Sequence, residues 1–123
     1  MKNSHKGVTG IRRLTDALGY SLTGFAAAFR NEQAFRQVVW AAAILIPIAL
    51  WLPVGAVETA LLIASVVLVA IVELLNSGIE AVVDRVSFRK HPLAKRAKDI
   101  ASAAVLLSLI NAVVVWSVIL LGY

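Results

Sequence analysis

The chain has 123 residues, of which 60% are hydrophobic, with a mean hydropathy of +0.85 and a net charge of +5. A soluble domain of this size could not bury so much apolar surface, so the composition indicates an integral membrane protein. The absence of cysteine excludes disulfides and thiolate metal sites. We expect a single domain over residues 1–123.

The first predicted element is an amphipathic helix over about residues 11–31, after a polar tail. Its apolar residues recur at spacings of three and four, and its arginines lie mainly on the other side. This pattern is typical of a helix that lies in the membrane interface with its cations toward anionic headgroups. Gly19 and Gly24 predict a bend or break within this helix.

A first membrane span is predicted over about residues 35–57. Pro47 predicts a kink within it, which a neighbouring helix or side chain can accommodate. Trp40 and Trp51 suit the two membrane interfaces as anchors. Residues 53–55, with the sequence Pro-Val-Gly, predict a turn before the next helix.

The second span, over about residues 59–86, carries the main polar feature of the chain. Five polar residues at offsets of 0, 3, 4, 7 and 11 share one face of a helix: Glu73, Asn76, Ser77, Glu80 and Asp84. Carboxylates at membrane depth are costly and by default mark a functional site. At about 1.5 Å per residue, Glu73 lies about 21 Å into the span and Glu80 about 31 Å, against a hydrocarbon core of about 30 Å. Glu73 is therefore expected inside the bilayer and Glu80 at its surface.

A basic linker at residues 85–98, interrupted by Pro92, leads to a third span over about residues 99–122. Small residues near the start of this span permit close contact with another helix. Trp116 is expected near the last interface as a further aromatic anchor. The predicted fold class is therefore an all-α membrane protein with an N-terminal amphipathic surface helix and three transmembrane helices.

The cations are distributed asymmetrically along the chain. All twelve Lys and Arg residues lie before residue 37 or between residues 85 and 98, and the connection between the first two spans has none. The positive-inside rule then places the N-terminus and the second loop in the cytoplasm and the C-terminus outside. Because membrane topology explains the positive charge, we expect no nucleic-acid partner.

The acidic stripe ends beside the basic linker, and this neighbourhood suggests phosphoryl transfer. Carboxylates can bind Mg²⁺ while Lys and Arg hold phosphate oxygens. A carboxylate buried slightly deeper could take a proton from a lipid hydroxyl, because buried carboxyl groups hold protons more tightly. Depth alone assigns Glu73 to the lipid hydroxyl and Glu80 to the metal. The chain has no Walker loop or kinase glycine loop, so any nucleotide site differs from the soluble ones.

Four blocks of the sequence are specific enough to indicate a family: GYSLTG, NEQAFRQ, ELLNSGIEAVVDR and RAKDIASAAVL. With them the chain, from Arg13 to about Tyr123, resembles the small prokaryotic diacylglycerol kinases. The resemblance implies a homotrimeric bundle in the bacterial inner membrane, with a periplasmic C-terminus and active sites shared between protomers. It also implies transfer of the γ-phosphate of ATP to diacylglycerol, with Mg²⁺, to give phosphatidic acid in phospholipid metabolism.

The resemblance assigns roles to the residues at matching positions. It implies that Glu73 is the general base, that Asn76 is an active-site amide, and that Glu32 and Glu80 bind the metal. The implied nucleotide contacts are Arg13, Tyr20, Glu32, Glu80, Arg89, Lys90, His91, Lys98 and Asp99. The implied contacts with the lipid substrate are Arg13, Ser21, Glu73 and Ser102.

Simpler interpretations stay open for several of these positions. Glu32 and Arg36 are four residues apart and could form an ion pair on a helix surface. Asn76 could serve only contact between helices. Asp84, beside Arg85, is expected to form a structural pair at the membrane surface.

The linker departs from the family pattern. Residues 86–93, VSFRKHPL, are more basic than that pattern and include Pro92, so His91 could instead be a solvated loop residue. Leu22 stands where an aromatic residue is common in the family, so the resemblance does not carry a stacking role over to this position.

Two other functions are compatible with the same residues. A polyprenol kinase, for example for undecaprenol, would use the same blocks and differ only in its acceptor, although the surface helix with its GYS sequence favours diacylglycerol. A small oligomeric membrane transporter would need Glu73 but would have little use for Glu32, Lys98 or Asp99. ATP-dependent labelling of lipid separates the transporter from both kinases.

Overall fold

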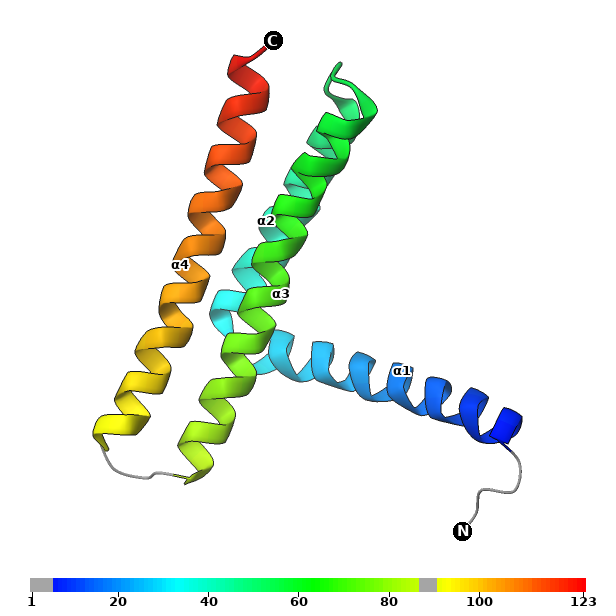
Figure 1. Ribbon diagram of the computed structural model, residues 1–123, viewed down its shortest axis with the longest axis vertical. Coiled ribbons are helices and arrows are strands. Elements are labelled where there is room, and N and C mark those ends of the chain that lie inside the picture. Colours follow the sequence, from blue (N-terminus) through cyan, green and yellow to red (C-terminus); the bar gives the residue numbers. More distant parts are fainter. Residues whose placement is uncertain (1–5, 87–90) are drawn as a thin grey trace.

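The computed structural model describes residues 6–86 and 91–123 of the chain. Within these ranges it contains no strand and four helices, α1 (Lys6–Asn31), α2 (Gln33–Trp51), α3 (Ala56–Val86) and α4 (Pro92–Leu121) (Figure 1). α2, α3 and α4 are each long and apolar enough to cross a membrane. The predicted all-α fold, with an N-terminal helix followed by three spans, is confirmed.

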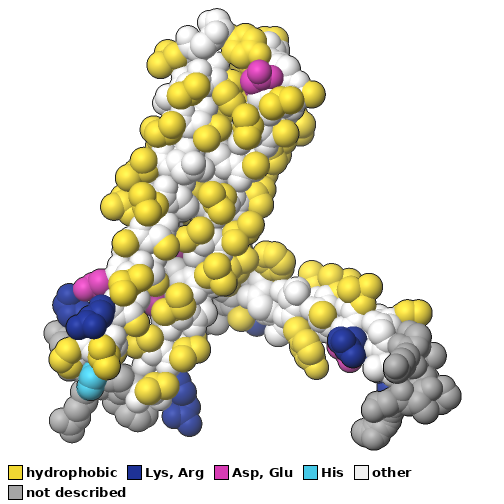
Figure 2. Space-filling view, viewed as in Figure 1, with side chains coloured by type: hydrophobic (Ala, Val, Ile, Leu, Met, Phe, Trp, Pro, Cys, Tyr) yellow, Lys and Arg dark blue, Asp and Glu magenta, His cyan; other side chains and the backbone are white. Residues whose placement is uncertain are grey.

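The three spans form a bundle in which α3 packs against both α2 and α4. α1 leaves the bundle near the start of α2, points away from it, and has much less contact with the rest of the chain than the spans have with one another (Figure 1). Apolar side chains cover the outside of the spans and one side of α1 (Figure 2). A helix that is apolar on all sides belongs in lipid or inside a larger assembly, so this surface agrees with membrane-crossing helices.

α1 is longer than the sequence predicted, and it is one uninterrupted helix. It begins at Lys6, five residues before the predicted start, and continues as one helix through Gly19 and Gly24, so the predicted break is wrong. A glycine inside a helix costs only about 1 kcal/mol relative to alanine, which the surrounding turns can offset. Thr23 Oγ1 also donates to the Gly19 carbonyl at 3.0 Å, four residues earlier on the same helix.

α4 begins at Pro92, seven residues before the predicted start of the third span. Proline is compatible with the first position of a helix, because the N–H that it lacks would have no partner there. The preceding residue, His91, caps the helix: its Nδ1 accepts a hydrogen bond from the Leu93 N–H at 3.1 Å. The second half of the basic linker is therefore the first two turns of α4.

The connection between α2 and α3 consists of residues 52–55, so it lies earlier in the chain than the predicted span boundaries. α2 continues through Pro47 to Trp51, and α3 begins at Ala56, so residue 57 belongs to α3 rather than to the first span. Gly55 precedes α3, and the Glu58 carboxylate lies over it where a Cβ would stand. A side chain at position 55 would therefore displace Glu58.

A buried hydrophobic cluster lies at this end of the bundle. Ala49, Leu62 and Ile119 form a buried cluster from α2, α3 and α4. Trp116 packs against this cluster, and its indole Nε1 donates to the Leu62 carbonyl at 3.3 Å. Trp116 thus points into the bundle, which corrects the prediction that it is an interfacial anchor; Trp51, 80% exposed, remains free to act as one.

Candidate functional site

Glu73 is the charged side chain most deeply buried in the described part of the bundle, with 6% of its surface exposed. It lies on α3, 17 positions after Ala56, which places it about 26 Å along the helix from its start. Asn76, one turn later, donates from Nδ2 to Glu73 Oε1 at 3.4 Å. An amide donor beside a buried carboxylate offsets part of the cost of placing that carboxylate away from water.

The oxygen of the Asn76 side-chain amide has no hydrogen-bond donor among the described residues. This atom, Oδ1, is buried. An unpaired buried acceptor is costly, and a donor such as a hydroxyl group would relieve it. Glu73 and Asn76 therefore leave one buried acceptor atom, the Asn76 Oδ1, without a donor among the described residues.

Glu73 lines a cavity of about 310 Å³ between α2, α3 and α4. Its other lining residues are nearly all apolar: Ala34, Val38, Ala41, Leu45, Val66, Val69, Leu109 and Ala112, with Gln37. An apolar cavity with one carboxylate suits an apolar molecule that carries a single polar group.

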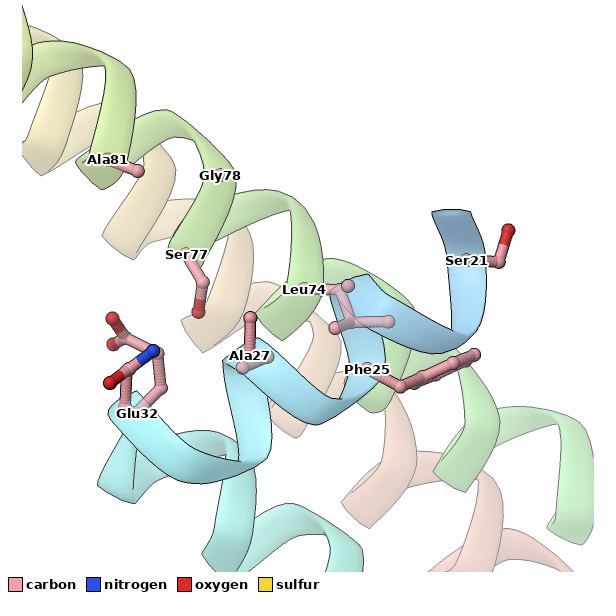
Figure 3. Close-up of a pocket in the computed structure, with 11 residues that line it drawn as sticks. Ser21, Phe25, Ala27, Glu32, Leu74, Ser77, Gly78 and Ala81 are labelled. Atoms are coloured by element: carbon pink, nitrogen blue, oxygen red, sulfur yellow. The ribbon is translucent and has the colours of Figure 1, made fainter. Parts of the chain in front are cut away.

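A second cavity, of about 470 Å³, lies between the C-terminal half of α1 and α3 (Figure 3). Glu32 and Ser77 stand on opposite sides of it, and the Ser77 hydroxyl points from α3 into the space between the two helices (Figure 3). Ser21 and Phe25 lie on α1 toward the other end. Ser77, which belongs to the same helix face as Glu73, connects this cavity with the acidic stripe.

Glu32 is the single residue between α1 and α2. Its backbone is extended, with φ −117° and ψ 107°, so the chain changes direction there. The ion pair that its spacing to Arg36 suggested does not form. Arg36 Nη1 instead donates to the carbonyl oxygens of Phe29 and Arg30, at 2.8 and 2.9 Å.

An ion pair connects α3 with α4 at the basic end of the bundle, and a second lies within the first turns of α4. Lys98 Nζ lies 2.6 Å from Asp84 Oδ1, and Lys95 Nζ lies 2.7 Å from Asp99 Oδ2. The expected pair of Asp84 with Arg85 is thus replaced by a pair with Lys98. The Glu80 carboxylate adds to the negative field at Lys98.

The structure brings together only part of the predicted site within one chain. Glu73 is hydrogen-bonded to Asn76, and Glu80 lies near Lys98. Ser21 and Glu32 line the same cavity at its two ends (Figure 3). Arg13, Tyr20 and Ser102 are exposed and line neither cavity. The remaining predicted nucleotide contacts at positions 89 and 90, Arg89 and Lys90, lie outside the described residues.

Three residues of interest were not predicted as site residues. Ser77 could have been found from its place on the polar stripe, four positions after Glu73. Asp84 could have been found in the same way, although its partner on α4 depends on how the linker folds. The contact of Arg36 with the carbonyls at the end of α1 could not be predicted from the sequence, because it depends on the backbone turn at Glu32.

The fold and these groups define a class of protein: a small helical membrane protein with a buried carboxylate and a cluster of charged side chains at one end of its bundle. The sequence pattern of the family described as "Prokaryotic diacylglycerol kinase" matches residues 19–120. The chain belongs to this family.

Curated relatives support the same assignment over nearly the whole chain. The chain is 56% identical over 117 residues to the diacylglycerol kinase of Pseudomonas aeruginosa, covering 95% of each. It is 53% identical over 112 residues to that of Escherichia coli K12, covering 91% of this chain and 92% of the relative. The corresponding values for Haemophilus influenzae are 46% over 112 residues, 91% and 95%.

Proposed function

We propose that this protein transfers the γ-phosphate of ATP to the hydroxyl of diacylglycerol and produces phosphatidic acid. The observation that carries the proposal is the Glu73–Asn76 pair, buried within a membrane-crossing helix of a chain from the diacylglycerol kinase family. A lipid hydroxyl can reach this pair from the bilayer, whereas a soluble acceptor would have to leave water to do so.

In the proposed reaction, Glu73 is the general base. The acceptor hydroxyl gives its proton to the Glu73 carboxylate while its oxygen forms a bond to the γ-phosphorus. The bond from that phosphorus to the oxygen bridging to the β-phosphate breaks, and ADP leaves. The Asn76 amide holds Glu73 through its Nδ2, and its free Oδ1 can orient the acceptor hydroxyl.

The nucleotide is proposed to bind at the basic end of the bundle. Lys98 and Asp99 lie on the second turn of α4, beside Glu80 near the end of α3. The Lys98 ammonium suits phosphate oxygens, and its pair with Asp84 keeps it at this end of the bundle. From the resemblance we carry over Arg13 and Tyr20 as further nucleotide contacts.

Mg²⁺ is the proposed metal, bound by Glu32 and Glu80. Within residues 6–86 and 91–123 no group of three or more His, Cys, Asp or Glu side chains could hold a metal. Two carboxylates, those of Glu32 and Glu80, suit Mg²⁺, because this ion is commonly held by one or two carboxylates while water and substrate phosphates complete its coordination shell. Bound there, Mg²⁺ would neutralise charge on the phosphate oxygens.

We further propose that the working enzyme is a homotrimer whose sites are shared between protomers. Arg13, Tyr20 and Ser102 lie outside both cavities in a single chain, so a neighbouring chain is needed to bring them to the reacting groups. The apolar outer surfaces of the spans offer area for such contact.

The proposed location is a bacterial inner membrane, with the basic end in the cytoplasm. Charged side chains gather at the end of the bundle where α3 meets α4 and along α1 (Figure 2). This end would face cytoplasmic ATP and leave the C-terminus periplasmic.

The test is phosphate transfer from labelled ATP in mixed micelles that contain diacylglycerol and undecaprenol side by side, with Glu80→Gln as the blank. We expect labelled phosphatidic acid. Labelled undecaprenyl phosphate as the main product would reassign the acceptor, and labelling of neither lipid would exclude a lipid kinase.

A further inference from the structure

The turn between α1 and α2 has an unusual arrangement of charge. Glu32 and Arg36 have opposite charges and a spacing that favours pairing, yet Arg36 is directed to backbone carbonyls. Among the described residues no cation pairs with Glu32, so its carboxylate stands without an ion-pair partner there at the edge of the cavity between α1 and α3.

The carbonyls that Arg36 contacts belong to the last turn of α1. The last four carbonyl groups of a helix have no donor within the helix, and the partial negative charge of the helix end attracts a cation. Arg36 Nη1 contacts two of these carbonyls, those of Phe29 and Arg30, from the first turns of α2. It therefore caps α1 from the next helix and joins the two helices.

The backbone geometry at Glu32 links this cap to the direction in which α1 leaves α2. Only Glu32 separates the two helices, and its N–H still bonds to the Ala28 carbonyl at 2.8 Å, as in a continuing helix. The extended torsion angles at Glu32 thus set both the direction of α1 and the direction of the Glu32 side chain.

Aromatic packing supports the same turn. The rings of Phe29 and Trp40 meet edge to face with centroids 6.3 Å apart, and Phe35 is 3% exposed. These contacts should keep both helices folded when the cap is removed, so the effect of losing Arg36 is a shift of the turn rather than unfolding.

We propose that Arg36 is a positioning residue for Glu32: its guanidinium caps α1, fixes the turn, and holds the Glu32 carboxylate toward the cavity as an unpaired cation ligand. This inference rests on the proposed function, in which Glu32 binds the metal that accompanies ATP. Arg36 itself touches neither metal nor substrate.

The experiment measures Mn²⁺ binding to the purified full chain in micelles by electron paramagnetic resonance, without turnover. The variants are Arg36→Met, Arg36→Lys, Glu32→Gln and the double variant Arg36→Met/Glu32→Gln. Arg30→Met is the matched control, because it removes a neighbouring exposed arginine side chain and leaves the cap in place.

We expect Arg36→Met to weaken Mn²⁺ binding about tenfold, as loss of a group that orients a ligand commonly does. Arg36→Lys should recover part of this loss, because it keeps a cation at the helix end. Arg30→Met should bind as the wild type does. The double variant should bind no more weakly than Glu32→Gln alone, because Arg36 acts through Glu32.

Amide hydrogen exchange over residues 28–36 gives a second readout. Exchange there should be faster in Arg36→Met than in the wild type or Arg30→Met, because the turn loses its cap. If Arg36→Met destroys the fold, Arg36→Lys carries both measurements.

Three results would overturn the inference: wild-type Mn²⁺ affinity in Arg36→Met, fully additive losses in the double variant, or no effect of Glu32→Gln. Failure of the proposed function would look different. The wild-type chain would then bind Mn²⁺ through Glu32 but would not phosphorylate diacylglycerol.

Discussion

Lys98 on α4 and Asp84 on α3 lie 2.6 Å apart, Nζ to Oδ1, across the ends of two helices joined by the basic linker. Their side chains are 42% and 63% exposed, so the pair contributes little to the free energy of unfolding. The pair instead fixes the position of a side chain: it holds the long Lys98 side chain beside Glu80 at the proposed nucleotide site.

Replacing Asp84 by Asn should therefore affect nucleotide use more than stability. We expect Asp84→Asn to raise the KM for ATP by a factor of about 1.4 to 5, the range that corresponds to an exposed pair of about 0.2–1 kcal/mol, with kcat and Tm nearly unchanged. Glu58→Gln, which removes a carboxylate from the opposite end of α3, should leave KM unchanged. An unaltered KM in Asp84→Asn would show that Lys98 needs no such partner.

The sequence was sufficient for the features that depend on composition and periodicity. The apolar runs predict three spans, and the helical spacing of Glu73 and Asn76 places them on one face, where the structure joins them by a hydrogen bond of 3.4 Å. Burial of Glu73 follows as well, because a carboxylate at that depth must face the interior of the bundle.

Other features depend on local geometry that a residue pattern does not contain. The start of α4 depends on the His91 cap and on proline at the first helical position. Trp116 faces the bundle because the Leu62 carbonyl offers it an acceptor there. The contact of Arg36 with α1 requires the extended backbone at Glu32, which no spacing rule indicates.

Glu80→Gln should abolish turnover by weakening Mg²⁺ binding. The amide keeps the size of the side chain but loses the negative charge that a hard cation requires. We expect kcat at ordinary Mg²⁺ to fall about a hundredfold or more, with partial recovery as Mg²⁺ is raised. The measurement is the initial rate of lipid phosphorylation over a Mg²⁺ titration. Near-normal rates at low Mg²⁺ would remove Glu80 from the metal site.

Glu73→Gln should separate chemistry from nucleotide binding. Glutamine can still accept the hydrogen bond from Asn76, but it cannot take the proton of the acceptor hydroxyl. We expect kcat to fall about 10²- to 10⁴-fold, the usual contribution of a general base. Affinity for a fluorescent ATP analogue should stay within about twofold of the wild type, because Glu73 opens to the cavity between the spans. Loss of nucleotide binding would contradict this division of roles.

Leu62→Ala should destabilise the far end of the bundle. Leu62 is fully buried between α2 and α4, and its removal leaves a void that neighbouring side chains fill only in part. We expect the free energy of unfolding to fall by about 2 kcal/mol, the lower end of the range for buried leucines. Leu121→Ala, at a site 85% exposed, is the control and should change it by less than about 0.5 kcal/mol. Equal effects of both variants would argue against a packed cluster at this end.

The orientation in the membrane can be tested on α4 alone, because the chain has no native cysteine. Leu93 and Leu121 are both exposed and lie at opposite ends of this helix. The basic linker at residues 85–98 should remain in the cytoplasm, since the connection at residues 52–55 carries no cation to compete with it. A maleimide that cannot cross membranes should label Leu121→Cys in spheroplasts and Leu93→Cys only after lysis. The opposite pattern would place the basic end, and with it the proposed nucleotide site, on the side of the membrane away from cytoplasmic ATP.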